Sequence, residues 1–492
     1  MNIRDIVRAD FEIIGKIDLD FKKVKCNSKE IDEGDLFVAI VGQNSDGHEF
    51  IDEAINKGAS VIVYEKSRYS PTRRDDLTWI GVEDSRDALA WIASLYYGNP
   101  SQRLHLIGIT GTNGKTTTSY LVREILNGYG KKTGLIGTIR YLLDKQEIKA
   151  PHTTPDALQF QALLDEMLKR GIDYVISEVS SHALSLKRVD YSKFEVAVFT
   201  NLSRDHLDFH KDMEEYFLAK KRLFTELLKE DGKAVINIDD EYGKRLAEEI
   251  RASKILFSLH NREADLFVKK YKLSFRGTEI EIVLNGETHS IKTELIGIPN
   301  VYNTLCAISV ALCFGIPMDV IKSSLLNAKA PDGRFENINE GQNFSVFVDY
   351  AHTPDALERL LMSVVRLREE IGQTGRIITV FGCGGNRDRG KRPQMGKIAS
   401  DLSDFVIVTS DNPRWEKPRE IIREIEEGIT RENYMVVTNR EDALKVAVEM
   451  CESGDILIVA GKGHEDYQEI EGKRIPFDDR EVLRKILREL KR

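Results

Sequence analysis

Cysteine is scarce in this sequence and shows no regular spacing. The five cysteines are Cys26, Cys306, Cys313, Cys383 and Cys451, and no two of them form a C-x-x-C pair. This scatter disfavours both a disulfide framework and a zinc site. We therefore expect a protein of a reducing compartment.

Long hydrophobic runs are also lacking. The first twenty residues carry charges every few positions and contain no apolar stretch of signal-peptide length. The longest apolar candidate, residues 301–318, is interrupted by Asn303 and Thr304 and is short for a membrane span. We expect a buried helix in this segment, no membrane span, and a cytoplasmic protein.

Positive charge is not in excess. The 71 Lys and Arg residues are outnumbered by 80 Asp and Glu residues, which gives a formal net charge of −9. A chain with this balance has no general attraction for polyanions, so we expect no nucleic-acid partner. A small, specific anion site remains compatible with the composition.

Buried strand segments that alternate with helical segments are abundant. Hydrophobic residues make up 41% and charged residues 31% of the 492 positions, as in soluble globular enzymes. A chain of this length suggests about three domains. Turn-forming clusters at residues 98–101 and 331–333 place the boundaries, giving domains of residues 1–102, 103–330 and 331–492. The alternation predicts an α/β fold with parallel sheets and crossover helices.

A glycine-bearing turn follows the strand segment 104–110. Residues 108–120 read GITGTNGKTTTSY, with Gly111 and Gly114 ahead of Lys115 at the start of a helical pattern. Backbone N–H groups at the start of a helix point at a bound anion, and a lysine there reaches terminal phosphates. The common loop would have a glycine at Ile109, so the pattern predicts a shorter phosphate loop. A chance Gly-Lys-Thr at an ordinary helix start is the alternative.

Polar residues follow two further buried strand segments, 173–177 and 195–200. The first runs into Glu178, and the second is followed by Asn201, Asp205 and His206. Open α/β sheets bind ligands at the carboxyl ends of their strands. Glu178 and His206 are therefore candidate metal ligands, although ordinary surface residues fit the spacing equally well.

Loops that follow strands recur in the last third of the chain. They contain DYAHTPDA (349–356), GCGGNRD (382–388), SDNPRWEKP (410–418) and GKGHEDYQ (461–468). The glycine-rich loop is not a dinucleotide fingerprint, because Arg387 stands where the third glycine is required. The planar guanidinium of Arg414 suits a carboxylate ligand, with a solvated surface arginine as the alternative. We expect the other three loops to face a ligand, whereas the glycine-rich loop fits a structural loop and a ligand loop equally well.

Taken as a set and in order, nine motifs resemble the Mur ligase family along the whole chain. They are GTNGKTT, EVSSHAL, TNLSRDHLDFH, LAKKRLF, GxPNVYN, DYAHTPDA, GCGGNRDRGKRP, DNPR and GKGHEDYQ. The family's phosphate loop also lacks the first glycine. The resemblance implies an N-terminal UDP-sugar-binding domain, a central P-loop ATPase domain with a mostly parallel sheet, and a C-terminal Rossmann-like domain that binds an incoming amino acid.

The resemblance also implies an activity. A family member of this kind joins a diamino acid to UDP-N-acetylmuramoyl-L-Ala-D-Glu through an acyl phosphate, with ATP and Mg²⁺ as cofactors, in peptidoglycan synthesis. The DNPR motif favours meso-diaminopimelate as the added amino acid, and lysine is the alternative. We expect a monomer.

Residue roles follow from the resemblance by position. Lys115, Glu178, His206 and Lys220 are implied to be catalytic. Thr116 and Glu178 would hold one magnesium ion, and His206 a second with Lys220. An ammonium has only donors, so Lys220 would serve as a carbamate. The implied ATP contacts are Gly111, Thr112, Asn113, Gly114, Lys115, Thr116, Thr117, Asn303, Arg334 and Asp349.

Two substrate sites are implied in the same way. The UDP-substrate contacts are Ser28, Thr153, Thr154, Ser180 and Arg188. The amino-acid contacts are Arg387, Asp411, Asn412, Arg414, Gly461 and Glu465.

Two other functions stay open at this stage. A folate polyglutamate synthetase of the same build would not depend on a UDP-sugar. A nucleotide-switch or motor ATPase would hydrolyse ATP without an amino acid.

Overall fold

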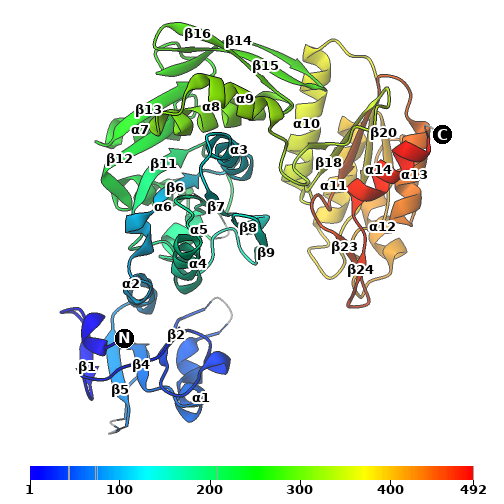
Figure 1. Cartoon of the computed structure of the whole chain (residues 1–492). Coiled ribbons are helices and arrows are strands. Elements are labelled where there is room, and N and C mark those ends of the chain that lie inside the picture. The colour runs from blue at the N-terminus through cyan, green and yellow to red at the C-terminus, as the bar shows by residue number, and fades with distance from the viewer. Residues whose placement is uncertain (43–44, 73, 75, 208, 491–492) are drawn as a thin grey trace. The chain divides into compact units, whose positions relative to one another are not determined.

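A computed structural model describes residues 1–42, 45–72, 74, 76–207 and 209–490. The chain divides into two compact units: residues 1–268, 283–287 and 302–324 form the first, and residues 269–282, 288–301 and 325–492 form the second. The predicted α/β fold with mostly parallel sheets is confirmed (Figure 1). The three domain ranges stay a prediction, because the compact units follow a different division.

The N-terminal sheet has five strands in the order β1-β5-β4-β3-β2. Strand β1 pairs antiparallel with β5, and the other pairs are parallel. Its strands are β1 (Glu12–Ile14), β2 (Val24–Lys25), β3 (Leu36–Val38), β4 (Val61–Glu65) and β5 (Thr78–Val82). The helices of this region are η1 (Ile3–Asp5), η2 (Ser28–Glu30), η3 (Gly47–Phe50), α1 (Ile51–Asn56), α2 (Ser85–Tyr96) and η4 (Pro100–Arg103). The predicted linker at 98–101 therefore includes the start of a short helix, with Pro100 and Ser101 buried.

The middle sheet has eleven strands in the order β16-β15-β14-β13-β12-β11-β6-β10-β7-β8-β9. Strands β13 to β7 in this order pair in parallel. The strands are β6 (His105–Thr110), β7 (Thr133–Ile136), β8 (Arg140–Leu143), β9 (Gln146–Lys149), β10 (Tyr174–Glu178), β11 (Phe194–Phe199), β12 (Leu228–Asn237), β13 (Ser253–Ser258), β14 (Leu266–Ser274), β15 (Gly277–Leu284) and β16 (Glu287–Thr293). Because β6, β10 and β11 are parallel neighbours, their carboxyl ends share one edge.

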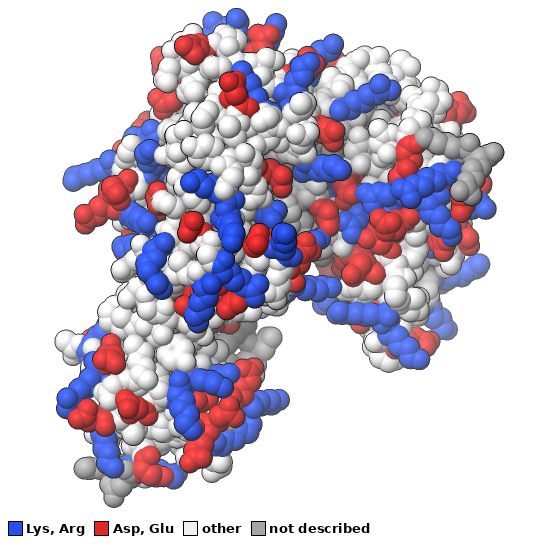
Figure 2. Space-filling view, in the orientation of Figure 1, with Lys and Arg blue, Asp and Glu red and all other residues white. Residues whose placement is uncertain are grey.

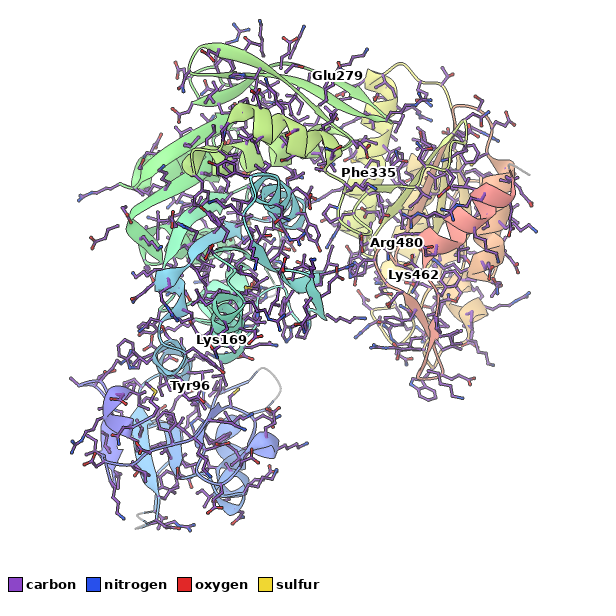
Figure 3. All side chains as sticks on the ribbon, viewed as in Figure 1. Tyr96, Lys169, Glu279, Phe335, Lys462 and Arg480 are labelled. Carbon is purple, nitrogen blue, oxygen red and sulfur yellow. The ribbon has the colours of Figure 1, made fainter. Side chains whose placement is uncertain are left out.

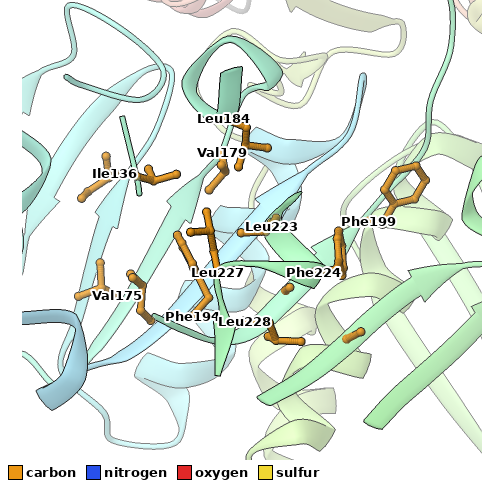
Figure 4. Packing of buried hydrophobic residues seen from close by; sticks show 14 of the residues in the cluster. Ile136, Val175, Val179, Leu184, Phe194, Phe199, Leu223, Phe224, Leu227 and Leu228 are labelled. Carbon is orange, nitrogen blue, oxygen red and sulfur yellow. The ribbon is translucent and has the colours of Figure 1, made fainter. Parts of the chain in front are cut away.

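Helices complete this part of the chain. They are α3 (Lys115–Gly128), α4 (Ala157–Lys169), α5 (Ser181–Ser185), α6 (Met213–Thr225), α7 (Glu241–Glu249), α8 (Ile298–Cys313) and α9 (Met318–Asn327). The largely buried strands β10 and β11 supply Val175 and Phe194 to a core that α6 closes with Leu223 and Phe224 (Figure 4). Burying each such side chain stabilises the fold by about 1.5–3 kcal/mol. The segment 301–318 contains the predicted buried helix, which ends at Cys313.

The C-terminal sheet has six strands in the order β17-β18-β22-β19-β20-β21, parallel except for β17. The strands are β17 (Glu336–Asn337), β18 (Ser345–Asp349), β19 (Ile377–Phe381), β20 (Phe405–Val408), β21 (Tyr434–Val436) and β22 (Ile456–Ala460), followed by the hairpin β23 (Tyr467–Ile470) and β24 (Lys473–Pro476). Its helices are α10 (Pro354–Glu370), α11 (Lys391–Leu402), α12 (Pro418–Glu426), α13 (Arg440–Met450) and α14 (Asp479–Glu489). Helices cover both faces of this sheet (Figure 1). Because β18, β22, β19 and β20 are parallel, the loops that follow them emerge at the same edge of the sheet.

The surface carries both signs of charge. Lys and Arg side chains are interspersed with Asp and Glu over the visible face (Figure 2). All five cysteines are free thiols. No helix in the described part of the chain is long and apolar enough to cross a membrane.

Candidate active site

The phosphate loop connects β6 to α3 and depends on two glycines. Gly111 and Gly114 have φ angles of 146° and 87°, which side chains with a Cβ rarely adopt. A Cβ at Gly111 would lie 1.9 Å from Thr200 Oγ1, and one at Gly114 would lie 2.5 Å from Asn303 Oδ1. Both positions therefore require glycine.

The residues after β11 hold this loop from the neighbouring strand. Thr200 Oγ1 donates to the Asn113 carbonyl at 2.7 Å, and the Asn113 N–H donates to Asn201 Oδ1 at 3.0 Å. Lys115 Nζ donates to the carbonyls of Gly111 and Thr112, both at 2.9 Å. The lysine thus lies over the loop whose amides would receive phosphate oxygens. Thr200 and Asn201 were not among the predicted ATP contacts.

Three further predicted nucleotide contacts lie around the same loop. Thr112 Oγ1 is 3.1 Å from the hydroxyl of Tyr216, whose pKa burial raises to about 12. Thr117 lies in the first turn of α3. Asn303 accepts a hydrogen bond from Thr118 Oγ1 at 3.3 Å, so α8 is tied to α3.

Glu178 lies at the end of β10 and is fully buried among hydroxyl groups. Its Oε2 accepts from the hydroxyls of Thr116 and Thr138, each at 2.9 Å, and its Oε1 accepts from the Thr138 N–H at 3.0 Å. A Cβ at Gly137 would lie 2.3 Å from Oε1, so a larger residue there would displace the carboxylate from this position. Thr138 was not predicted, although it follows a buried strand and a glycine in the same way as the phosphate loop.

Four of the five predicted UDP-substrate residues connect to Glu178 either directly or through Thr138 and Thr154. Thr153 Oγ1 is 3.1 Å from Thr138 Oγ1, and Thr154 Oγ1 donates to the Glu178 carbonyl at 2.8 Å. Thr154 Oγ1 also accepts from the Ser180 N–H at 3.2 Å, and Arg188 donates to the Thr154 carbonyl at 2.9 Å.

The fifth predicted substrate residue, Ser28, lies in the region of the N-terminal sheet. Its hydroxyl donates to Glu53 Oε2 at 2.7 Å, and Lys57 Nζ donates to its carbonyl at 3.2 Å. Contacts with α1 and its C-cap residue therefore hold Ser28 within the N-terminal region.

Lys220 is a buried amine on α6, with 1% of its surface exposed. Its Nζ donates to the Gly111 carbonyl at 3.0 Å and lies 4.5 Å from the centre of the Tyr216 ring. Burial lowers the pKa of Lys220 well below its ordinary value, and the positive charge of Lys115 lowers it further, against a smaller opposing effect of Asp205. The unprotonated amine is thereby favoured, and an unprotonated amine is a nucleophile.

His206 follows in the loop between β11 and α6. It adopts a positive φ of 54°, and its ring lies 4.9 Å from the His182 ring and 6.0 Å from the Tyr216 ring. Its side chain is 43% exposed. The loop thus places an imidazole beside helices α5 and α6.

The oxygen donors of Thr116 and Glu178 are of the type that Mg²⁺ prefers. Among the described residues, no three His, Cys, Asp or Glu side chains form a metal-binding group. Magnesium commonly binds through one or two carboxylates together with substrate phosphates and water. The donor set at this edge of the sheet therefore fits a magnesium ion bound with a nucleotide.

The two remaining predicted ATP contacts belong to the second compact unit. Asp349 ends β18 and accepts from the N–H groups of Phe335 and Ala351 at 2.8 and 2.9 Å. Burial raises its pKa, against an opposing effect of Arg334. The Arg334 guanidinium lies over the Tyr350 ring, 5.5 Å from its centre. Arg334 and Asp349 therefore both contact the loop that follows β18, and Asp349 also contacts the residue next to Arg334.

Four predicted amino-acid contacts meet at the ends of β20 and β22. Asp411 and Asn412 follow β20, and Gly461 and Glu465 follow β22. Asn412 Nδ2 donates to Glu465 Oε2 at 2.9 Å. A Cβ at Gly461 would lie 3.7 Å from Asp411 Oδ2, which places the two loops in contact.

Arg414 is paired within the protein. Its Nε donates to Glu469 Oε2 at 3.0 Å and one terminal nitrogen donates to the Gly385 carbonyl at 2.8 Å. The sequence predicted a guanidinium available to a carboxylate ligand, whereas here Glu469 supplies the carboxylate. The adjacent Trp415 is 71% exposed, and the predicted contact Arg387 is also exposed.

A buried arginine joins the loops that carry Arg387 and Arg414. Arg392 is fully buried, and its guanidinium contacts Glu416 at 2.9 Å, Glu424 at 2.7 Å and the Gly384 carbonyl at 3.1 Å. The hydrogen bonds from Arg392 lower the pKa of Glu416 to about 2. Sequence reasoning missed this network, although Arg392 belongs to the GCGGNRDRGKRP motif.

A second buried pair fixes the strand ends themselves. Arg440 and Asp479 are both fully buried and make hydrogen bonds of 2.7 and 2.8 Å. Arg440 also donates to the carbonyls of Ser410 and Ala460 at 3.3 and 3.1 Å, one at the end of each loop-bearing strand. The spacing of the two loops is therefore set by a charged pair in the core.

Comparison with known proteins covers the whole chain. The Mur ligase family catalytic domain matches residues 20–97, the Mur ligase middle domain matches residues 109–311, and the glutamate ligase domain of Mur ligases matches residues 333–463. The chain is 43% identical over 493 residues to the UDP-N-acetylmuramoyl-L-alanyl-D-glutamate--2,6-diaminopimelate ligase of Clostridium botulinum (strain ATCC 19397 / Type A), with 100% of both chains covered. It is 45% identical over 467 residues to the ligase of that name from Aquifex aeolicus (strain VF5), covering 95% of this chain and 93% of that one.

Solved structures agree with these sequence relatives. A structure described as a UDP-N-acetylmuramoyl-L-alanyl-D-glutamate--2,6-diaminopimelate ligase matches with a TM-score of 0.70 and 31% identity over 96% of both chains. A MurF ligase of Thermotoga maritima, in complex with ADP, shares the fold with a TM-score of 0.62 and 21% identity, covering 95% of this chain and 98% of that one. On these matches and the shared fold, the chain belongs to the Mur ligase family of ATP-dependent ligases.

Proposed function

We propose that this ligase adds a diamino acid, meso-diaminopimelate, to UDP-N-acetylmuramoyl-L-Ala-D-Glu during peptidoglycan synthesis. The observation that carries the proposal is the buried amine of Lys220 against Gly111 of the phosphate loop, with Thr116 and Glu178 at the same edge of the sheet. The names of the relatives support the substrate and the amino acid.

The proposed reaction has two steps. A carboxylate oxygen of the UDP-linked dipeptide attacks the γ-phosphorus of ATP, and the bond to the bridging oxygen breaks to release ADP. The amine of the diamino acid then attacks the acyl phosphate, loses a proton and expels inorganic phosphate. Lys115 and the loop amides hold the phosphate oxygens, where their positive charge offsets the charge of the approaching carboxylate.

Thr116 and Glu178 would hold a magnesium ion, with His206 as a ligand of a second. Such an ion would neutralise charge on the phosphate oxygens. Thr138 positions Glu178 through two hydrogen bonds, and Gly137 leaves room for the carboxylate.

Lys220 would act in its carbamate form. The unprotonated amine adds to carbon dioxide and loses a proton, which converts a donor into an anionic acceptor. The low pKa of Lys220 supports this step, because only the unprotonated amine has a free electron pair.

The choice of amino acid depends on Arg414 and its partner. The distal carboxylate of meso-diaminopimelate would replace Glu469 on the guanidinium, whereas lysine has no carboxylate to do so. Exchange of Glu469 for the ligand carboxylate on Arg414 is favoured when the ligand also makes hydrogen bonds to Asn412. Lysine remains the second candidate.

A side-by-side assay tests the proposal. Purified protein is given ATP, Mg²⁺ and the UDP-dipeptide with either meso-diaminopimelate or lysine, and product and phosphate are both measured. We expect product with meso-diaminopimelate, and phosphate release only when all substrates are present. Product with lysine alone would reassign the amino acid. Steady phosphate release without any amino acid would instead indicate an ATPase that ligates nothing.

A further inference from the structure

Lys462 is a fully buried lysine that has no role in the reaction described above. It follows β22 in the GKGHEDYQ motif, directly after Gly461. Figure 3 labels it at the strand ends of the C-terminal sheet. A buried ammonium is costly unless its hydrogens are paired, so its partners reveal what it does.

All three polar partners of Lys462 are predicted amino-acid contacts. Its Nζ donates to Glu465 Oε2 at 3.1 Å and to Asn412 Oδ1 at 3.2 Å, and lies 3.6 Å from Asp411 Oδ1. The Tyr467 ring lies 5.6 Å away on another side. Glu465 and Asn412 thus accept two of the three ammonium hydrogens, and Asp411 contributes a nearby opposite charge without a hydrogen bond.

This lysine joins loops from strands that are not neighbours. In the sheet order, β19 separates β20, which leads to Asn412, from β22, which leads to Lys462. Gly382 follows β19, and a Cβ there would lie 2.3 Å from the Thr409 carbonyl. Glycine at this point lets the flanking loops approach, and the long side chain of Lys462 spans the gap.

Lys462 also fixes which way the Asn412 amide faces. Asn412 Oδ1 accepts from Lys462 Nζ and, at 2.9 Å, from the N–H of Glu469. Because both partners are donors, the amide oxygen must face them, and Nδ2 is turned to Glu465. The orientations of Asn412 and Glu465 thus depend on one ammonium.

The charges of the cluster leave a preference for a cation. Asp411 and Glu465 contribute two negative charges and Lys462 contributes one positive charge, while Arg440 is paired with Asp479. One negative charge remains to attract the ammonium of an amino acid. Without Lys462 the two carboxylates would repel each other and turn apart.

We propose that Lys462 is a positioning residue for the amino-acid subsite: it holds the Glu465 carboxylate in the orientation that receives an ammonium group of the diamino acid, and it keeps Asn412 Nδ2 turned away as a donor. The proposal rests on the proposed ligase function. Its competitor is a purely structural ion pair, which would not distinguish one substrate from another.

The test compares KM and kcat for each of the three substrates. Lys462→Met removes the charge at similar length, and Lys462→Arg keeps the charge with a different geometry. Lys417→Met is the matched control, since Lys417 is 82% exposed and lies 3.7 Å from Glu420. We expect Lys462→Met to raise the KM for the diamino acid at least about tenfold. The KM values for ATP and the UDP-dipeptide should stay within about twofold of wild type.

Lys462→Arg should show a smaller rise, again in the KM for the diamino acid alone, and Lys417→Met should match wild type. An unchanged KM for the diamino acid, or an equal rise for all three substrates, would overturn the proposal. If circular dichroism shows that Lys462→Met is unfolded, the same criteria apply to Lys462→Arg and to the shorter Lys462→Gln. A wild-type protein that forms no product with any diamino acid would contradict the proposed function instead.

Discussion

The environment of the buried Lys220 amine determines its chemistry. Lys221 follows it in the sequence, yet its Nζ pairs with Glu249 at 2.7 Å and does not reach the phosphate loop. Lys220 and Lys221 are adjacent residues of the same type in different environments. The same substitution at each position therefore tests the environment alone.

Replacing Lys220 by alanine should lower the ligation rate by roughly 100-fold, because the proposed carbamate would no longer place an anionic group beside the phosphates. A small carboxylate such as acetate should restore part of this rate by entering the space left behind. Lys221→Ala should keep wild-type activity. Initial rates measured at increasing acetate check the expectation, and a complete absence of rescue, together with no carbon dioxide adduct by mass spectrometry, would speak against the carbamate.

At the scale of the secondary-structure elements, the two loops after β19 and β20 form one rigid edge. Arg392 on α11 joins them through Glu416 and Glu424, and the Asn386 N–H also donates to Glu416. Three elements thus share one buried guanidinium, which rigidifies the predicted amino-acid site.

The pH dependence of stability should report this junction. The folded-state pKa of Glu416 is about 2, below its ordinary value of 4.5. A depressed carboxyl pKa stabilises the fold above the unfolded-state value, and this contribution is lost as pH falls from about 4.5 toward 2. The unfolding free energy of wild type should therefore exceed that of Glu416→Gln at pH 6, and the difference should shrink below pH ~4.5.

Urea denaturation of both proteins between pH 6 and pH 3 measures this difference. The control is Glu420→Gln, in which a carboxylate 55% exposed on the same segment is changed. A difference between wild type and Glu416→Gln that stays constant over this range would contradict the assigned ionisation.

The sequence predicted secondary-structure elements better than it predicted which side chains interact. Strands, the phosphate loop and Glu178 follow from local patterns: apolar runs, glycine spacing and polar residues at strand ends. Arg414 shows the limit, since its carboxylate partner Glu469 lies 55 residues further along the chain and no local pattern identifies it. Thr138 and Arg392 were missed for the same reason, because their roles come from tertiary contacts.

At the scale of the whole molecule, the chain consists of two compact units whose ranges interleave in sequence. The predicted boundaries at residues 102 and 330 rest on turn-forming clusters, and such clusters do not reveal that residues 269–282 belong with the C-terminal part. Each unit has its own buried core and its own buried charged side chains.

Loss of the Arg440–Asp479 pair should destabilise the second unit alone. Asp479→Asn leaves a fully buried guanidinium without its counter-charge, which typically costs about 3–5 kcal/mol. Scanning calorimetry should show one unfolding transition moved to lower temperature and the other unchanged. The control Asp355→Asn alters an exposed pair with Arg359 and should move neither. A uniform shift of all transitions would contradict independent units.

Trp415 gives the molecule a natural optical reporter. Of the three tryptophans, Trp79 is 1% exposed and Trp91 is partly buried in the N-terminal region, so only Trp415 combines high exposure with a place beside Arg414. Solvent relaxation red-shifts the emission of an exposed indole. The long-wavelength part of the fluorescence spectrum should therefore report events at the DNPR loop, which allows titration of unlabelled amino acids without coupling to turnover.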